Sequence, residues 1–142
     1  MIIGIDPGKD SGLVTLVNGE IFSLKTLSPE AVLKEIDKFK GCEGMTVIFE
    51  DSRLQPIFSR GTNARAAGRI ARNVGMVDGQ CRDIEDCCKR LGIRYIPISP
   101  KGKGRKLNAQ AFTEMTGWQG KRTNSHERDA VLVAWPYRWG SR

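Results

Sequence analysis

The first twelve residues constrain the fold more than any other stretch of the chain. Residues 2–6 form an apolar run that ends in a carboxylate, and Pro7 and Gly8 follow directly. The apolar run predicts a buried strand, and the Pro-Gly pair predicts a turn after it. A carboxylate at the end of a buried strand is costly unless another group pairs with it. We therefore expect the rest of the chain to bring partners to Asp6.

The pattern beyond this strand predicts an α/β fold. Strands are expected over 12–17 and 20–25, joined by Asn18-Gly19, a dipeptide typical of two-residue hairpins. The remaining expected elements are, in order, a helix capped by Ser28, a strand over 45–50, a helix over 63–91, a strand over 93–98, and helices over 107–115 and 124–136. The order β-β-β-α-β-α-β-α-α predicts a mixed five-stranded sheet with helices on both faces.

The length of 142 residues fits a single domain spanning 1–142. No apolar run is long enough to cross a membrane, and the first residues lack a signal-peptide pattern. A cytoplasmic location is therefore expected. The four cysteines show no C-x-x-C spacing, which argues against a structural zinc site.

Positive charge is concentrated in two parts of the chain. The net charge is +7, and neither 52–77 nor 87–113 contains an acidic residue. This segregation favours a polyanionic partner, with a merely basic soluble protein as the alternative. The candidate phosphate contacts are Arg53, Arg60, Arg65, Arg69, Arg72, Lys101, Lys103, Arg105, Lys106, Lys121 and Arg122.

The predicted helix over 63–91 carries two distinct faces. Apolar residues recur at gaps of three and four from Ala67 to Leu91, as in a helix buried along one side. Gly68, Gly75 and Gly79 fall on another face. Because glycine weakens a helix, these residues predict a close crossing by another backbone. The alternative is a break or kink near Gly75.

Four side chains are candidates for a metal site. Asp6 and Glu50 end two strands that can be parallel neighbours, and Asp129 follows His126 by three residues on one helix face. Carboxylates that share a dry site need a cation between them, and oxygen ligands favour Mg²⁺ or Mn²⁺. Two such ions can activate water and stabilise the leaving oxygen of a phosphodiester.

Each of these candidates has a simpler explanation. Asp6 can be a turn residue, Glu50 can begin a surface loop, His126 can lack a role, and Asp129 can pair with Arg128 or Arg122. Three nearby acids are expected outside the site, with Asp10 and Asp51 solvated in loops and Glu127 capping a helix. Among these three, Asp51 is the strongest candidate to join the site.

Three motifs together resemble the RuvC family of Holliday-junction resolvases, and the element order resembles its short phage-type members. The motifs are Ile3-Gly4-Ile5-Asp6-Pro7-Gly8 followed by Gly12, Glu50 at a strand end, and His126-Glu127-Arg128-Asp129-Ala130. The resemblance implies a ribonuclease-H-like fold and a magnesium-dependent homodimer that cuts four-way DNA junctions, leaving 5′-phosphate ends. It also implies that Asp6 bridges two ions, that Glu50 binds one, and that His126 and Asp129 bind the other. Residues 63–91 are similar to the dimer helix, and the location implied is a bacterial or phage-infected cell.

The chain departs from the family where DNA is selected. Bacterial members carry an aromatic wedge soon after the strand-ending Glu, whereas here Asp51-Ser52-Arg53-Leu54 follows and Phe58 is the wedge candidate. Alternatives are a nuclease of this fold acting on flaps, forks or RNA-containing substrates, and a non-catalytic DNA-binding protein with a vestigial metal site. The Gly-Ile-Asp-Pro-Gly run also resembles the phosphate loop of actin-like kinases, but the chain is too short for their second domain.

Overall fold

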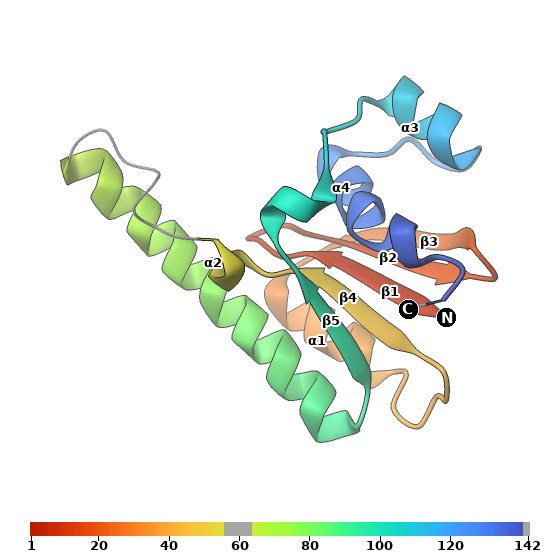
Figure 1. The fold of residues 1–142 in the computed structure, drawn as a ribbon, viewed down its shortest axis with the longest axis horizontal. Helices are drawn as coiled ribbons and strands as arrows, with labels where there is room; N and C mark the ends of the chain where they lie inside the picture. Colours follow the sequence, from red (N-terminus) through yellow and green to blue (C-terminus); the bar gives the residue numbers. More distant parts are fainter. Residues whose placement is uncertain (56–63, 141–142) are drawn as a thin grey trace.

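The fold is built on one mixed sheet (Figure 1). The computed structural model describes residues 1–55 and 64–140. The strands are β1 (Ile2–Asp6), β2 (Ser11–Val17), β3 (Glu20–Leu27), β4 (Thr46–Glu50) and β5 (Arg94–Ile98), in the spatial order β3-β2-β1-β4-β5. β2 is antiparallel to both β1 and β3, whereas β4 is parallel to both β1 and β5. The predicted five-stranded mixed sheet is confirmed.

The helices are α1 (Pro29–Asp37), α2 (Ala64–Leu91), α3 (Ala109–Thr116) and α4 (Ser125–Ala134). Both of the helices for which the sequence indicates a capping residue, α1 and α4, begin directly after that residue. The side chain of Ser28 accepts a hydrogen bond from the Ala31 amide at the start of α1. At the start of α4, Asn124 and Glu127 form the expected capping box. The side chain of each residue accepts a hydrogen bond from the backbone amide of the other residue.

The two faces of the sheet carry separate apolar cores. On β1, Ile3 and Ile5 pack in the core that α1 and α2 cover, while Ile2 packs in the core under α4. The same alternation on β4 places Phe49 on the first face and Ile48 on the second. Helices therefore cover both faces of the sheet, α1 and α2 on one and α4 on the other, as expected.

The α2 helix is continuous from Ala64 to Leu91, so the alternative of a break near Gly75 is wrong. Figure 1 shows its N-terminal part extending away from the sheet. A Cβ added at Gly68, Gly75 or Gly79 would meet nothing within 4 Å among the described residues. The backbone crossing that these glycines predict is therefore not made within the described part of one chain. No helix in the described ranges is long and apolar enough to cross a membrane.

Two glycines allow α4 to lie directly on the sheet. A Cβ added at Gly12 would overlap the backbone carbonyl of His126, and one added at Gly4 would press on Ala134. Gly12 is also the register partner of Asp6 across the β1–β2 pair. The first turn of α4 is therefore held beside the end of β1.

Four sequence predictions lie outside what the structure describes. Phe58 and Arg60 lie outside the described residues, and so do the side chains of Arg65 and Arg69 on α2. The wedge role of Phe58 and the phosphate contacts of these arginines stay predictions.

Candidate active site

Three of the four predicted ligands converge at one edge of the sheet. Asp6 ends β1, Glu50 ends the parallel neighbour β4, and Asp129 lies on α4 above them. Lys103 marks the point where they meet. Its Nζ atom lies 2.6 Å from Glu50 Oε2, 3.7 Å from Asp6 Oδ1 and 3.9 Å from Asp129 Oδ2.

The turn after Asp6 is fixed from both sides. The hydroxyl of Ser11 donates to the Gly8 carbonyl and accepts from the Gly8 amide, at 3.0 and 3.2 Å. The side-chain amide of Gln80 on α2 donates to the same carbonyl at 2.8 Å. These bonds hold the end of β1, and with it the Asp6 carboxylate, against α2.

Lys103 reaches the carboxylates from a short turn after β5. The residues Pro100–Lys103 form one 3₁₀ turn, which begins at Ser99 directly after the strand. The Lys103 side chain is 12% exposed, so it is not presented to solvent as the other lysines of its loop are. Sequence reasoning placed Lys103 among the phosphate contacts and missed this position. The available signal was that β5 runs parallel to β4, so its following loop leaves the sheet at the edge of Asp6 and Glu50.

Burial and neighbouring charges shift the pKa values of Asp6 and Lys103. Burial raises the pKa of Asp6 to about 7, and the nearby Glu50 and Asp129 add to the rise while Lys103 opposes it. Burial alone disfavours the ammonium of Lys103, but the three carboxylates outweigh it and raise its pKa above the usual value. Lys103 is therefore positively charged.

His126 lines the same site without joining the ion pairs around Lys103. A hollow of about 380 Å³ opens beside the carboxylates, and its lining includes Asp6, Lys103, His126 and Asp129. Asp10 also lies on this wall, next to the turn after β1. His126 therefore lines the same hollow as Asp6 and Asp129, which has space for a polar ligand, and its role as a metal ligand stays a prediction.

The donor set suits Mg²⁺ or Mn²⁺, although the side chains do not surround such an ion as they stand. Across residues 1–55 and 64–140, no three acidic, histidine or cysteine side chains are arranged to hold a metal ion. However, the converging groups are oxygen donors of the kind these ions prefer. Glu50 Oε2 is buried, and its nearest cationic group is Lys103 Nζ at 2.6 Å. A buried carboxylate that faces a cation has the chemistry of a metal ligand, and the two-ion site stays a prediction.

Arg53 belongs to a second charged cluster, at the turn after β4. Its guanidinium donates to Asp51 Oδ1 and Oδ2 at 2.9 and 2.8 Å, and to Glu85 of α2 at 2.8 Å. Asp51 is buried, so the expectation that it is solvated is wrong. Burial alone would raise its pKa, but the hydrogen bonds from Arg53 outweigh burial and lower it. These pairs tie the turn to α2, and the phosphate contact predicted for Arg53 stays a prediction.

Glu127 has the capping role expected of it, whereas Asp129, in the part of the chain that the structure describes, does not form the ion pair with Arg128 or Arg122 that is its simpler explanation. Glu127 caps α4, as expected, and its carboxylate also pairs with Lys121. Within the described ranges, Asp129 pairs with neither Arg128 nor Arg122, and its Oδ2 lies 3.5 Å from Lys106 Nζ. Arg128 donates instead to the backbone carbonyls of Leu107 and Thr123.

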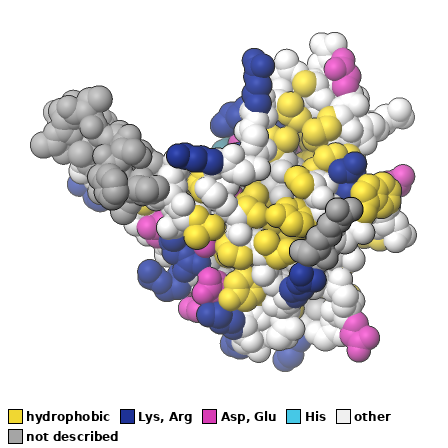
Figure 2. All heavy atoms as spheres, viewed as in Figure 1, with side chains coloured by type: hydrophobic (Ala, Val, Ile, Leu, Met, Phe, Trp, Pro, Cys, Tyr) yellow, Lys and Arg dark blue, Asp and Glu magenta, His cyan; other side chains and the backbone are white. Residues whose placement is uncertain are grey.

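On the face that Figure 2 shows, the basic side chains are spread out rather than gathered in one patch. Figure 2 shows Lys and Arg around an area of hydrophobic side chains, with acidic groups between them. Near the site, Lys106 is 76% exposed and borders the hollow. The remaining candidates that are exposed are Arg72, Lys101, Arg105, Lys121 and Arg122. The charge segregation along the sequence is therefore partly lost in the fold.

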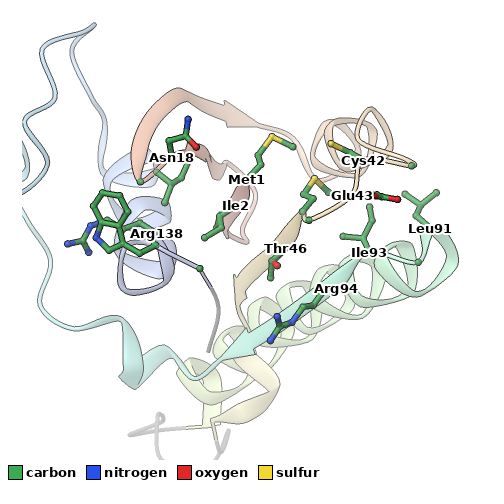
Figure 3. Close-up of a pocket in the computed structure, with 18 residues that line it drawn as sticks. Met1, Ile2, Asn18, Cys42, Glu43, Thr46, Leu91, Ile93, Arg94 and Arg138 are labelled. Carbon is green, nitrogen blue, oxygen red and sulfur yellow. The ribbon is translucent and has the colours of Figure 1, made fainter.

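A larger hollow lies at the opposite edge of the sheet. It measures about 780 Å³ and is lined by the first residues of the parallel strands, including Ile2, Thr46 and Arg94 (Figure 3). It contains Glu43 but none of the converging carboxylates. The hollow of about 380 Å³ is the candidate active site, because Asp6, Asp129 and His126 line it and these side chains can bind a metal ion or transfer a proton.

Comparison with known proteins identifies the fold. No protein-family model matches the sequence, and no curated protein matches it. Among solved structures, the chain is similar to T. thermophilus RuvC in complex with a Holliday junction substrate, with a TM-score of 0.60 and 16% identity over 97% of this chain and 92% of that one. The chain has a ribonuclease-H-like fold. The likeness covers nearly the whole of both chains and confirms the predicted fold class.

Proposed function

We propose that the protein is a metal-dependent endonuclease that resolves four-way DNA junctions. The observation that carries this proposal is the convergence of Asp6, Glu50 and Asp129 on one point, beside a hollow that His126 lines. The ribonuclease-H-like fold supports it, since the similar RuvC structure holds a Holliday junction substrate. The net charge of +7 supports a nucleic-acid partner.

In this proposal the carboxylates hold two Mg²⁺ ions, for which Mn²⁺ can substitute. Asp6, Glu50 and Asp129 would hold these ions, with His126 as a further candidate ligand, and the resemblance to the RuvC family implies that Asp6 is the ligand shared between them. When bound, the two ions supply an activated water and stabilise the leaving oxygen of a phosphodiester. His126 serves either as a ligand or as the group that carries a proton into the hollow. The products are a 3′-hydroxyl and a 5′-phosphate.

The proposed substrate contacts lie around the hollow. Lys106 borders it, and Lys101 and Arg105 are exposed on the same loop. Such side chains hold phosphates and position DNA without reading its sequence. Arg72, Lys121 and Arg122 are further proposed contacts.

Paired cutting of a junction requires two active sites, which we propose a homodimer supplies. A Cβ added at Gly68, Gly75 or Gly79 of α2 would meet nothing within 4 Å in the part of the chain that the structure describes, and Met76 on the same helix is 65% exposed. A second copy of α2 crossing at these glycines would bury this surface.

A panel of synthetic DNA forms tests the proposed substrate. Labelled four-way junction, flap, fork, linear duplex and RNA–DNA hybrid are incubated with the protein and Mg²⁺, and the products are resolved on denaturing gels. We expect paired nicks at symmetric positions in the junction and little cutting of linear duplex. Cutting of flaps, forks or hybrids with the junction left intact would transfer the same site to another substrate. Tight junction binding without cutting in either Mg²⁺ or Mn²⁺ would instead indicate a vestigial site.

A further inference from the structure

Lys103 occupies the point at which the carboxylates converge. We propose that Lys103 is an internal counter-ion that holds Asp6, Glu50 and Asp129 together without metal and leaves this position when metal ions bind. The inference rests on the proposed function, because it concerns the same carboxylates. It adds a built-in competitor to the metal site, which neither the sequence pattern nor the fold implies.

The distances around Lys103 Nζ support mutual exclusion. The ammonium lies 2.6 to 3.9 Å from one oxygen of each carboxylate. A Mg²⁺ ion requires its oxygen ligands at about 2.1 Å. The carboxylates must therefore close in around a metal at the point where Nζ now lies. An ammonium cannot share that point with a divalent cation, because both their volumes and their like charges oppose it.

The loop around Lys103 leaves room for its departure. Lys103 lies between Gly102 and Gly104, and a Cβ added at either glycine would meet nothing within 4 Å among the described residues. The turn is held by local bonds to Ser99, from the Gly102 amide to its carbonyl and from the Lys101 amide to its hydroxyl. The lysine stem is also long and flexible. Lys103 can therefore turn away without disturbing β5.

Lys106 provides a matched control in the same loop. Its Nζ lies 3.5 Å from Asp129 Oδ2, but the side chain is 76% exposed and pairs with only this carboxylate of the cluster. Replacing either lysine removes the same charge from the same segment. Only the loss of Lys103 empties the point of convergence.

Metal affinity without DNA is the first test. Isothermal titration calorimetry with Mn²⁺ compares the full-length wild type with Lys103→Met and Lys106→Met. A competitor that occupies the site in about nine molecules of ten weakens apparent affinity about tenfold. We therefore expect Lys103→Met to bind Mn²⁺ about tenfold more tightly than wild type, with a much smaller change for Lys106→Met. Equal affinity of wild type and Lys103→Met, or weaker binding by the variant, would overturn the inference.

Chemical labelling of the wild type gives a second readout that needs no variant. Acylation of lysine amines, followed by mass spectrometry, reports how accessible each Nζ is. We expect Lys103 to be protected in EDTA and to react faster with saturating Mn²⁺, while Lys106 reacts rapidly in both. Unchanged protection of Lys103 with Mn²⁺ bound would overturn the inference, and it decides the matter if Lys103→Met fails to fold.

The two proposals fail in different ways. Mn²⁺ binding that does not depend on Lys103 contradicts the counter-ion role and leaves the proposed nuclease intact. Absence of Mn²⁺ binding in wild type and both variants contradicts the proposed metal site, and with it the counter-ion role.

Discussion

At the residue scale, the raised pKa of Asp6 shows that its surroundings disfavour the charged carboxylate. Its pKa lies at about 7 instead of 3.8, first because it is buried and then because two other carboxylates lie nearby. The folded chain therefore holds a proton on Asp6 that the unfolded chain releases. Function and stability oppose each other at this residue, since a metal ligand is most useful when ionised.

This shift predicts how stability without metal depends on pH. Because the folded pKa of Asp6 is raised, its contribution is fully present below the unfolded pKa of 3.8 and is lost as pH rises through about 7. We expect the free energy of unfolding of wild type, relative to Asp6→Asn, to fall between these two pH values. Urea denaturation in EDTA measures it. A difference that stays constant with pH would contradict the raised pKa.

At the element scale, the site depends on how closely α4 approaches the sheet. Gly12 contacts the carbonyl of His126, which is backbone and cannot turn aside. We expect Gly12→Ala to destabilise the protein by about 1–3 kcal/mol, as overpacking typically does. Urea denaturation checks the stability, and cleavage should fall as well because α4 carries His126 and Asp129.

The matched control for this change is Gly102→Ala. A Cβ at Gly102 meets nothing within 4 Å among the described residues. The stability of this variant should stay close to that of wild type. If Gly12→Ala and Gly102→Ala have equal stability, then α4 does not depend on the contact at Gly12.

The elements show how far local sequence signals reach. Asp6 and Glu50 were predictable because each ends an apolar run, and parallel strands end at one sheet edge. The capping box of Asn124 and Glu127 was predictable because it spans only three residues. In contrast, the position of Lys103 depends on the path of a loop, which is fixed by contacts with distant parts of the chain.

The second charged cluster was missed for a similar reason. Arg53 and Asp51 are neighbours in sequence, but Glu85 joins them only because α2 packs against the turn after β4. Runs without acidic residues therefore overstate the charge available to DNA. A sequence shows which charges are present, and tertiary contacts decide which of them are already paired.

At the scale of the whole molecule, the exposed basic side chains of the loop after β5, Lys101, Arg105 and Lys106, should contribute to the salt dependence of DNA binding. The logarithm of the binding constant falls as the logarithm of the salt concentration rises, and each lost phosphate contact makes this slope less steep by about 0.9. We expect Lys101, Arg105 and Lys106 changed together to alanine to lower that slope, measured by fluorescence anisotropy with junction DNA. The control changes Lys34, Lys38 and Lys40, on and after α1, and should leave the slope unchanged. Equal slopes for both triple variants would place the loop off the DNA.

The proposed dimer depends on a glycine face that is open in one chain. A Cβ added at Gly75 would meet nothing within 4 Å among the residues the structure describes, so we expect a monomer to tolerate a leucine there, whereas a close helix crossing would be blocked. We expect wild type to sediment as a dimer at micromolar concentration and Gly75→Leu to shift toward monomer. Asn73→Leu, at an exposed position on another face of α2, should remain dimeric. A wild type that is monomeric even with junction bound would contradict the dimer.

The central claim is that the converging carboxylates form a metal-dependent nuclease site. The most direct measurement is single-turnover cleavage of a labelled four-way junction by wild type and Asp6→Asn, each with Mg²⁺ and with EDTA. We predict paired nicks by wild type with Mg²⁺ only, and a rate on the order of 10³-fold lower for Asp6→Asn, since metal ions supply several kcal/mol of the stabilisation. DNA binding by the variant should persist. Cleavage by Asp6→Asn at the wild-type rate, or equal cleavage in EDTA, would contradict the account.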